Sequence, residues 1–90
     1  MNSSLAFGKV IRELRKNAGF TQEQLGLEAD LRRTFVSLLE LGQQQPTLAT
    51  ILKLSKALNV SASKIIELVE VELRLYEGLI NQIKNTKQSG

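Results

Sequence analysis

The sequence contains no cysteine and no histidine, a single proline and few aromatic residues. The absence of cysteine excludes disulfides and thiolate metal sites, and the absence of histidine removes the commonest proton shuttle and metal ligand. No apolar run approaches the roughly 18 residues that span a bilayer, and the first residues do not have the basic and apolar regions of a secretory signal. We therefore expect a cytoplasmic chain with no membrane segment, no metal, no cofactor and no enzymatic activity.

Ninety residues are the size of one domain, and an apolar fraction of 42% is enough for one hydrophobic core. Aromatic residues make up only 4%, so that core has to be built mainly from Leu, Ile, Val and Ala. The net charge is +3, and the first sixty residues carry the whole excess, with eight basic side chains against five acidic ones. A basic surplus of this kind is modest evidence for a polyanionic partner such as nucleic acid.

Apolar residues recur at helical spacing almost throughout, and no stretch alternates with a period of two, so we predict an all-α fold. Gly19 and Gly42 are expected to end helices, and Thr21 with Gln24 forms a capping-box pattern. In the fourth helix we expect an apolar face that begins at Leu48. The predicted helices cover residues 5–17, 22–29, 32–41 and 48–58, and a fifth begins at Ser61 or Ser63.

Residues 22–41 carry the most informative pattern, two short helices separated by a tight break. A steep crossing of two helices needs a small residue at the contact, and Gly26 lies where that contact is expected. The second helix of such a pair can lie in the major groove of B-DNA with its N-terminal side chains on base edges.

Several short motifs accompany this pattern in a fixed order. They are Leu14-Arg15, Gly19-Phe20-Thr21-Gln22-Glu23-Gln24-Leu25, Val36-Ser37, Glu40, Gly42, Pro46-Thr47-Leu48 and Leu58-Asn59-Val60-Ser61. With them the chain resembles the Cro and phage-repressor helix-turn-helix family, the Xre-type regulators. The segment 32–37 also looks like the recognition helices of restriction–modification controller proteins. The resemblance implies a five-helix, lambda-repressor-like DNA-binding domain over residues 7–68.

The resemblance also implies roles for individual side chains. Gln22, at the start of the second helix, would hold a phosphate. Arg33 can donate two hydrogen bonds to guanine, and Thr34 and Leu38 can reach a thymine methyl group. Phe35 either contacts DNA or packs against the protein or a dimer partner. The candidate DNA-binding residues are Gln22, Arg32, Arg33, Thr34, Phe35, Ser37, Leu38 and Gln43.

Four further positions bear on how the third helix is supported and where it begins. Arg15 and Glu40 match a pair that in this family bridges the first helix to the end of the third, and a two-point arginine–carboxylate bond would fix the recognition helix without reading sequence. The chain departs from the family pattern at the turn, where Asp30 replaces the usual glycine. Arg32 stands where a Ser or Thr cap is common, so Asp30 becomes a candidate cap for the third helix.

The C-terminal third has a different pattern, in which apolar residues alternate spacings of three and four as in a coiled coil. A second apolar stripe runs beside this seam from Leu68 to Leu79, and Gly78 could bend or divide the segment. One small core cannot cover both stripes, so we predict a dimerisation extension over 69–86 and a frayed tail over 87–90. The alternative is that the seam folds back on its own core. The seam residues are Ile66, Val69, Leu73, Tyr76, Ile80 and Ile83.

Together these observations favour a transcriptional regulator that binds double-stranded DNA at a palindromic operator as a homodimer, because one recognition helix contacts too few base pairs for discrimination. A restriction–modification controller, an antitoxin and a phage-type repressor remain open. A protein-interaction adaptor is the main alternative, against which Arg32 and Arg33 argue. An enzyme is least supported, since carboxylates such as Glu67 and Glu70 lie on an amphipathic helix. No small-molecule ligand is evident.

Overall fold

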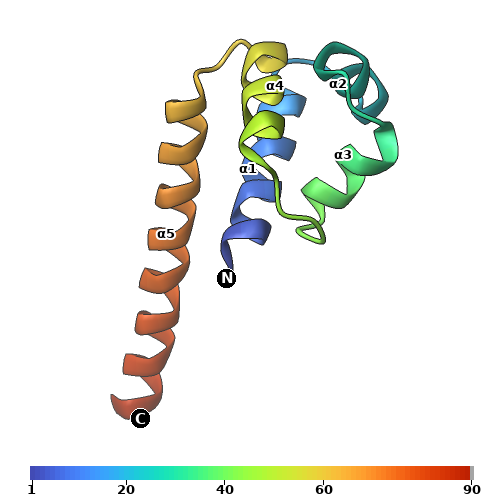
Figure 1. Ribbon diagram of the computed structural model, residues 1–90. Coiled ribbons are helices and arrows are strands. Elements are labelled where there is room, and N and C mark those ends of the chain that lie inside the picture. The colour runs from blue at the N-terminus through green and yellow to red at the C-terminus, as the bar shows by residue number, and fades with distance from the viewer. Residues whose placement is uncertain (90) are drawn as a thin grey trace.

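The computed structural model describes residues 1–89, with side chains as far as Thr86, and within that part of the chain it contains helices and no strand. The predicted all-α class and the number of five helices are confirmed (Figure 1). The helices are α1 (Ser3–Asn17), α2 (Gln22–Ala29), α3 (Arg33–Glu40), α4 (Leu48–Leu58) and α5 (Ala62–Ser89).

Local capping explains where most helices begin. α1 starts two residues earlier than predicted, because the Asn2 side chain accepts a hydrogen bond of 2.9 Å from the Leu5 amide. The capping box of α2 is present, with Thr21 and Gln24 each accepting from the other's backbone amide at 3.1 and 2.8 Å. Ser61 is the residue that caps α5, since its hydroxyl accepts from the Lys64 amide at 3.0 Å.

Two helices end, as predicted, at a glycine with a positive φ angle. Gly19 follows α1 with φ at 78°, and Gly42 follows α3 with φ at 73°. Glycine adopts this region without the steric cost that a Cβ atom brings. Both turns thus follow from the sequence alone.

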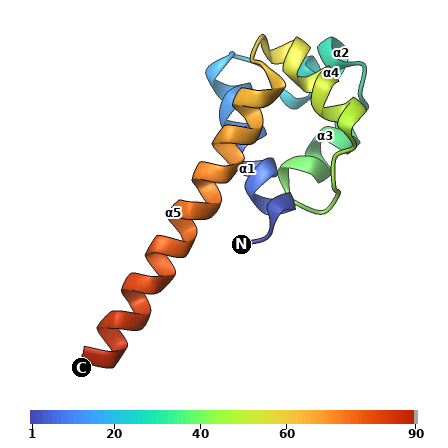
Figure 2. The ribbon, with the colours of Figure 1, turned by 60° about the vertical axis from the view of Figure 1, so that its left-hand side comes forward.

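The hydrophobic core takes residues from all five helices, with α1 packed against α3 and α5, and α2 packed against α3 and α4. Figures 1 and 2 show how these helices are arranged. In α4 the predicted face is wrong at its start, because Leu48 is 72% exposed whereas Leu54 and Leu58 are buried. In α5 the most deeply buried side chain is Ile65, which the predicted seam left out. The core residues are Ala6, Phe7, Val10, Ile11, Leu25, Ala29, Val36, Leu39, Leu54, Leu58, Ile65 and Val69.

α5 is one continuous helix that passes through Gly78 without a break and crosses the predicted domain boundary at residues 68 and 69. Its first part packs against α1, where Lys9 and Glu72 form an ion pair of 3.0 Å. Its second part leaves the body and runs past the N-terminus (Figures 1 and 2). The frayed tail predicted at 87–90 lies outside the described side chains. None of the helices in the described residues has the length and apolar character that a bilayer crossing requires.

Candidate nucleic-acid interface

The tight crossing of α2 and α3 depends on Gly26. A Cβ atom at this position would lie 2.6 Å from the Leu31 carbonyl oxygen, well inside van der Waals contact. The turn between the helices is made by Asp30, which has φ at 55° and ψ at 50° and therefore occupies the left-handed region. The Leu31 amide then donates to the Gly26 carbonyl at 2.8 Å. The predicted small contact residue is thus confirmed.

The start of α3 differs from one expectation. Asp30 ends α2 and does not cap α3, because the left-handed turn uses its backbone to close the preceding helix. Arg32 is the N-cap residue of α3, and no side-chain hydrogen bond accompanies that cap. The first amides of α3 therefore have no capping side chain at Arg32, and the N-terminus of a helix carries a partial positive charge. This end of α3 is electrostatically suited to an anion such as a phosphate.

A second glycine brings α1 against the other end of α3. A Cβ atom at Gly8 would collide with the backbone carbonyls of Leu39 and Glu40, the latter at 2.6 Å. Gly8 is buried, so the two backbones themselves are in contact at this point. Sequence reasoning missed this residue, although a glycine among the apolar residues of a helix often indicates close packing.

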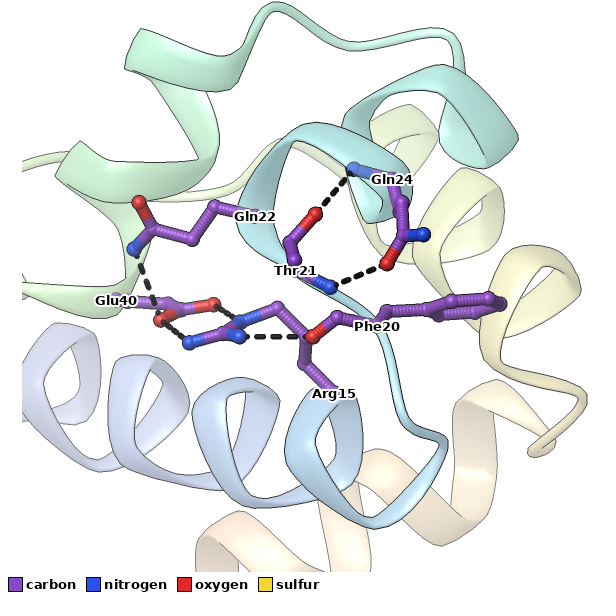
Figure 3. A network of polar contacts seen from close by, with 6 residues as sticks. All are labelled: Arg15, Phe20, Thr21, Gln22, Gln24 and Glu40. Atoms are coloured by element: carbon purple, nitrogen blue, oxygen red, sulfur yellow. Dashed lines mark hydrogen bonds and ion pairs between the residues drawn. The ribbon is translucent and has the colours of Figure 1, made fainter.

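The predicted bridge between Arg15 and Glu40 is present (Figure 3). Arg15 donates from Nε to Glu40 Oε2 at 2.7 Å and from Nη2 to Oε1 at 3.0 Å, and its Nη1 donates to the Phe20 carbonyl at 2.9 Å. The two side chains are 11% and 4% exposed. Hydrogen bonding to Glu40 raises the pKa of Arg15, against the opposing effect of burial.

Gln22 belongs to the same network, which the sequence did not indicate. Its Nε2 donates to Glu40 Oε1 at 3.1 Å (Figure 3), so a side chain at the start of α2 is tied to the last residue of α3. The side-chain amide nitrogen of glutamine carries two hydrogens. The second one is compatible with the predicted phosphate contact while the first is held by Glu40.

The other candidate DNA-binding residues fall into two groups. Arg32, Arg33 and Thr34 are exposed together at the N-terminal end of α3, and Gln43 is exposed beyond its C-terminal end. Ser37, Leu38 and Phe35 are partly buried, and Phe35 packs against the core of its own domain. That contact favours packing against the protein, rather than direct contact with DNA, as the role of Phe35.

The predicted dimer seam is divided by the fold. Val69 is 8% exposed and belongs to the domain's own core, and Leu73 packs against that core. The alternative, in which the seam folds back on its own core, therefore describes Val69 and Leu73. Ile80 is partly buried, and three residues remain exposed: Ile66, Tyr76 and Ile83 at 42%, 39% and 47%.

Comparison with known proteins identifies the family. Residues 11–65 match the sequence model of the helix-turn-helix family. The chain belongs to the Xre-type helix-turn-helix family. It is a DNA-binding transcriptional regulator of that family, and the relatives found are regulators rather than enzymes. Within the described residues, no cluster of acidic side chains is able to hold a metal ion.

Several relatives are restriction–modification controllers. The chain is 35% identical over 71 residues to control protein C.BamHI of Bacillus amyloliquefaciens. The aligned region covers 78% of this chain and 88% of that protein. The structure of the controller C.AhdI from Aeromonas hydrophila is 38% identical, with a TM-score of 0.66, and covers 68% of this chain and 92% of that one. The regulator ClgR of Corynebacterium glutamicum, at 18% identity, shows the same fold over 99% of this chain and 95% of its own, with a TM-score of 0.92.

Proposed function

We propose that this protein binds a palindromic DNA operator as a homodimer, with α3 of each copy in the major groove. The observation that carries the proposal is the exposed group Arg32, Arg33 and Thr34 at the start of a helix whose other end is fixed by Arg15 and Glu40. A rigid support places side chains accurately, and arginine with threonine at the head of a helix suits contacts with base edges and phosphates.

The roles within this group follow from chemistry and position. Arg33 and Thr34 lie in the first turn of α3, where side chains reach base edges, and Arg33 would donate two hydrogen bonds to a guanine. Arg32 precedes the helix and suits a phosphate, as do Gln22 and Gln43 at the other end. Leu38 would contribute an apolar contact with a thymine methyl. Such a regulator would work in the cytoplasm, where bacterial DNA is accessible.

Fluorescence anisotropy with labelled duplexes tests the proposal. The wild type should bind a duplex with two inverted half-sites far more tightly than one with a single half-site, and affinity should fall steeply as salt rises. Arg33→Ala should bind the cognate duplex more weakly, by about 1–3 kcal/mol, and should discriminate less at one base pair. Lys64→Ala is the matched control, because this exposed cation lies on α5 and should change little. Equal binding to all duplexes by wild type and Arg33→Ala would contradict the proposal.

We further propose that the regulated genes encode a restriction–modification pair, which rests on the similarity to C.BamHI and C.AhdI. The operator selected by the protein should then lie upstream of a nuclease or methyltransferase gene. An operator found only upstream of unrelated genes would remove this assignment and leave DNA binding intact. An adaptor function predicts no salt-dependent DNA binding at all.

A further inference from the structure

In the distal part of α5, residues 74–86, most of the apolar side chains remain exposed in the described part of the chain, and only Ile80 is partly buried. We call this part of α5 the arm. It extends beyond the N-terminus of α1 into open space (Figures 1 and 2). Leu75, Tyr76, Leu79 and Ile83 on the arm are 64%, 39%, 55% and 47% exposed. A helix with a broad apolar stripe is most stable when that stripe is buried against another element.

We propose that the arm pairs with the arm of a second copy as an antiparallel coiled coil, centred near residue 78. This inference rests on the proposed homodimer and specifies how the homodimer forms. Tyr76, Ile80 and Ile83 on the arm continue the a and d spacing of two heptads that begins at Leu73. Leu73 lies directly before the arm and also packs against the core of its own domain. In this register Tyr76 packs against the partner's Ile80, and Leu73 packs against the partner's Ile83, so each layer is apolar.

The charges beside the seam favour the antiparallel direction. Glu70, Glu77 and Lys84 are exposed and recur every seven residues along one flank. Antiparallel pairing about residue 78 forms two attractive pairs, each between Lys84 and the partner's Glu70. It also forms one repulsive contact, between the two copies of Glu77. Parallel pairing brings Glu72 to the partner's Glu77 twice and offers no attractive pair. Opposite charges on such flanks set the orientation of coiled coils.

The other flank supports the same register. Leu79 lies there, next to the two-fold axis, so the two copies of Leu79 meet each other. This contact would cover a leucine that is more than half exposed in the single chain. Glu72 on this flank is held by Lys9 of its own chain at 3.0 Å, which keeps that carboxylate away from the apolar seam.

The length of the arm matches the spacing of DNA half-sites. Ile65, fully buried in the core, lies thirteen residues before the proposed axis, which is roughly 20 Å at the rise of an α-helix. The two copies of Ile65, related by that two-fold axis, are then roughly 40 Å apart along the coil. Half-sites read from one side of B-DNA are about 34–36 Å apart. The separation of the two Ile65 positions is therefore of the same order as the distance between successive major grooves on one side of the duplex.

Single cysteine variants of the full chain test the register, because the natural sequence contains no cysteine. After mild oxidation, Leu79→Cys should form a disulfide-linked dimer, since its two copies meet at the axis. Ile83→Cys should not, because its two copies would lie roughly 15 Å apart along the coil. In a parallel coil Ile83→Cys would cross-link instead. Leu75→Cys, the most exposed of these positions, controls for random collision.

Charge reversal gives an independent readout. Lys84→Glu should weaken dimerisation by about three- to tenfold, measured by sedimentation equilibrium, because two attractive pairs become repulsive. The double variant Glu70→Lys with Lys84→Glu should restore it. A single variant as strong as wild type, or a double variant as weak as Lys84→Glu, would overturn the register.

The cross-linking outcomes separate this inference from the proposed function. Cross-linking of Leu79→Cys alone supports the antiparallel arm. Cross-linking of Ile83→Cys alone overturns it in favour of a parallel pair. A dimer that binds the two-half-site duplex while none of the variants cross-links overturns the arm and leaves the operator proposal standing. A protein that stays monomeric and shows no preference for two half-sites overturns both.

Discussion

Arg15 on α1 and Glu40 at the end of α3 are joined at two points, with Nε to Oε2 at 2.7 Å and Nη2 to Oε1 at 3.0 Å. Glu40 also accepts from Gln22 at 3.1 Å, so one carboxylate connects α1, α2 and α3. The pair is nearly buried and lies at the opposite end of α3 from Arg33. It therefore sets the orientation of the helix while leaving the exposed end free for a ligand.

Removing the carboxylate should cost substantial stability. Glu40→Ala leaves the guanidinium of Arg15 buried without its partner, and breaking a buried pair in this way costs about 3–5 kcal/mol in the free energy of unfolding. Urea denaturation measures the loss. Glu67→Ala is the control, because its ion pair with Lys64 at 3.8 Å is exposed and should contribute less than about 1 kcal/mol. Equal losses for the two variants would show that the Arg15–Glu40 pair does not support the fold.

The two helical glycines Gly26 and Gly78 should respond in opposite ways to alanine. Gly26→Ala forces a methyl group toward the Leu31 carbonyl and should destabilise the protein by about 1–3 kcal/mol. Gly78→Ala meets no atom within 4 Å and should stabilise it by about 0.5–1 kcal/mol through better helix propensity. Differential scanning calorimetry gives both values. A Gly26→Ala variant as stable as Gly78→Ala would mean that α2 and α3 can separate freely.

Arg33 and Arg32 should differ in what their loss does to DNA binding. Arg33→Ala should cost about 1–3 kcal/mol on the cognate duplex and relax preference at one base pair. Arg32→Ala should weaken binding to all sequences about equally and lower the salt slope by about one, as for a lost phosphate contact. Anisotropy titrations at several salt concentrations distinguish the two. The reverse pattern would exchange the assigned roles.

The link between α1 and α5 predicts a pH dependence at high pH. Hydrogen bonding to Glu72 raises the pKa of Lys9 above the ordinary value of 10.5. A raised pKa in the folded state contributes stability below the ordinary value, and that contribution is lost as the pH rises through the raised value. The difference in Tm between wild type and Lys9→Gln should therefore be constant from pH 7 to about 10 and shrink above that. A difference that disappears near pH 8 would contradict the assignment.

Features of the fold that depend on neighbouring residues could be predicted from the sequence. Gly19, Gly42 and the capping box at Thr21 and Gln24 predicted the start of α2 and the ends of α1 and α3, because each acts within one or two turns of the chain. The pair of Arg15 and Glu40 came from the resemblance to the family.

Features that depend on how distant helices pack could not be predicted. The contact of Gly8 with the end of α3 requires knowing which backbones approach each other, and Ile65 is buried because α5 docks on α1 with that face. Leu48 fits an apolar stripe by spacing yet lies outside the core. Asp30 was correctly expected at the turn. Its left-handed backbone ends α2, and its side chain does not cap α3.

Selection of bound sites from random duplex DNA tests the central claim most directly, since it reports half-site, spacing and symmetry together. We predict enrichment of two inverted half-sites whose centres are about one helical turn apart, or a whole multiple of it, with the base opposite Arg33 losing its preference in Arg33→Ala. Enrichment of no sequence, or of the same sequence by wild type and Arg33→Ala, would contradict the assignment of α3 as the DNA-reading helix.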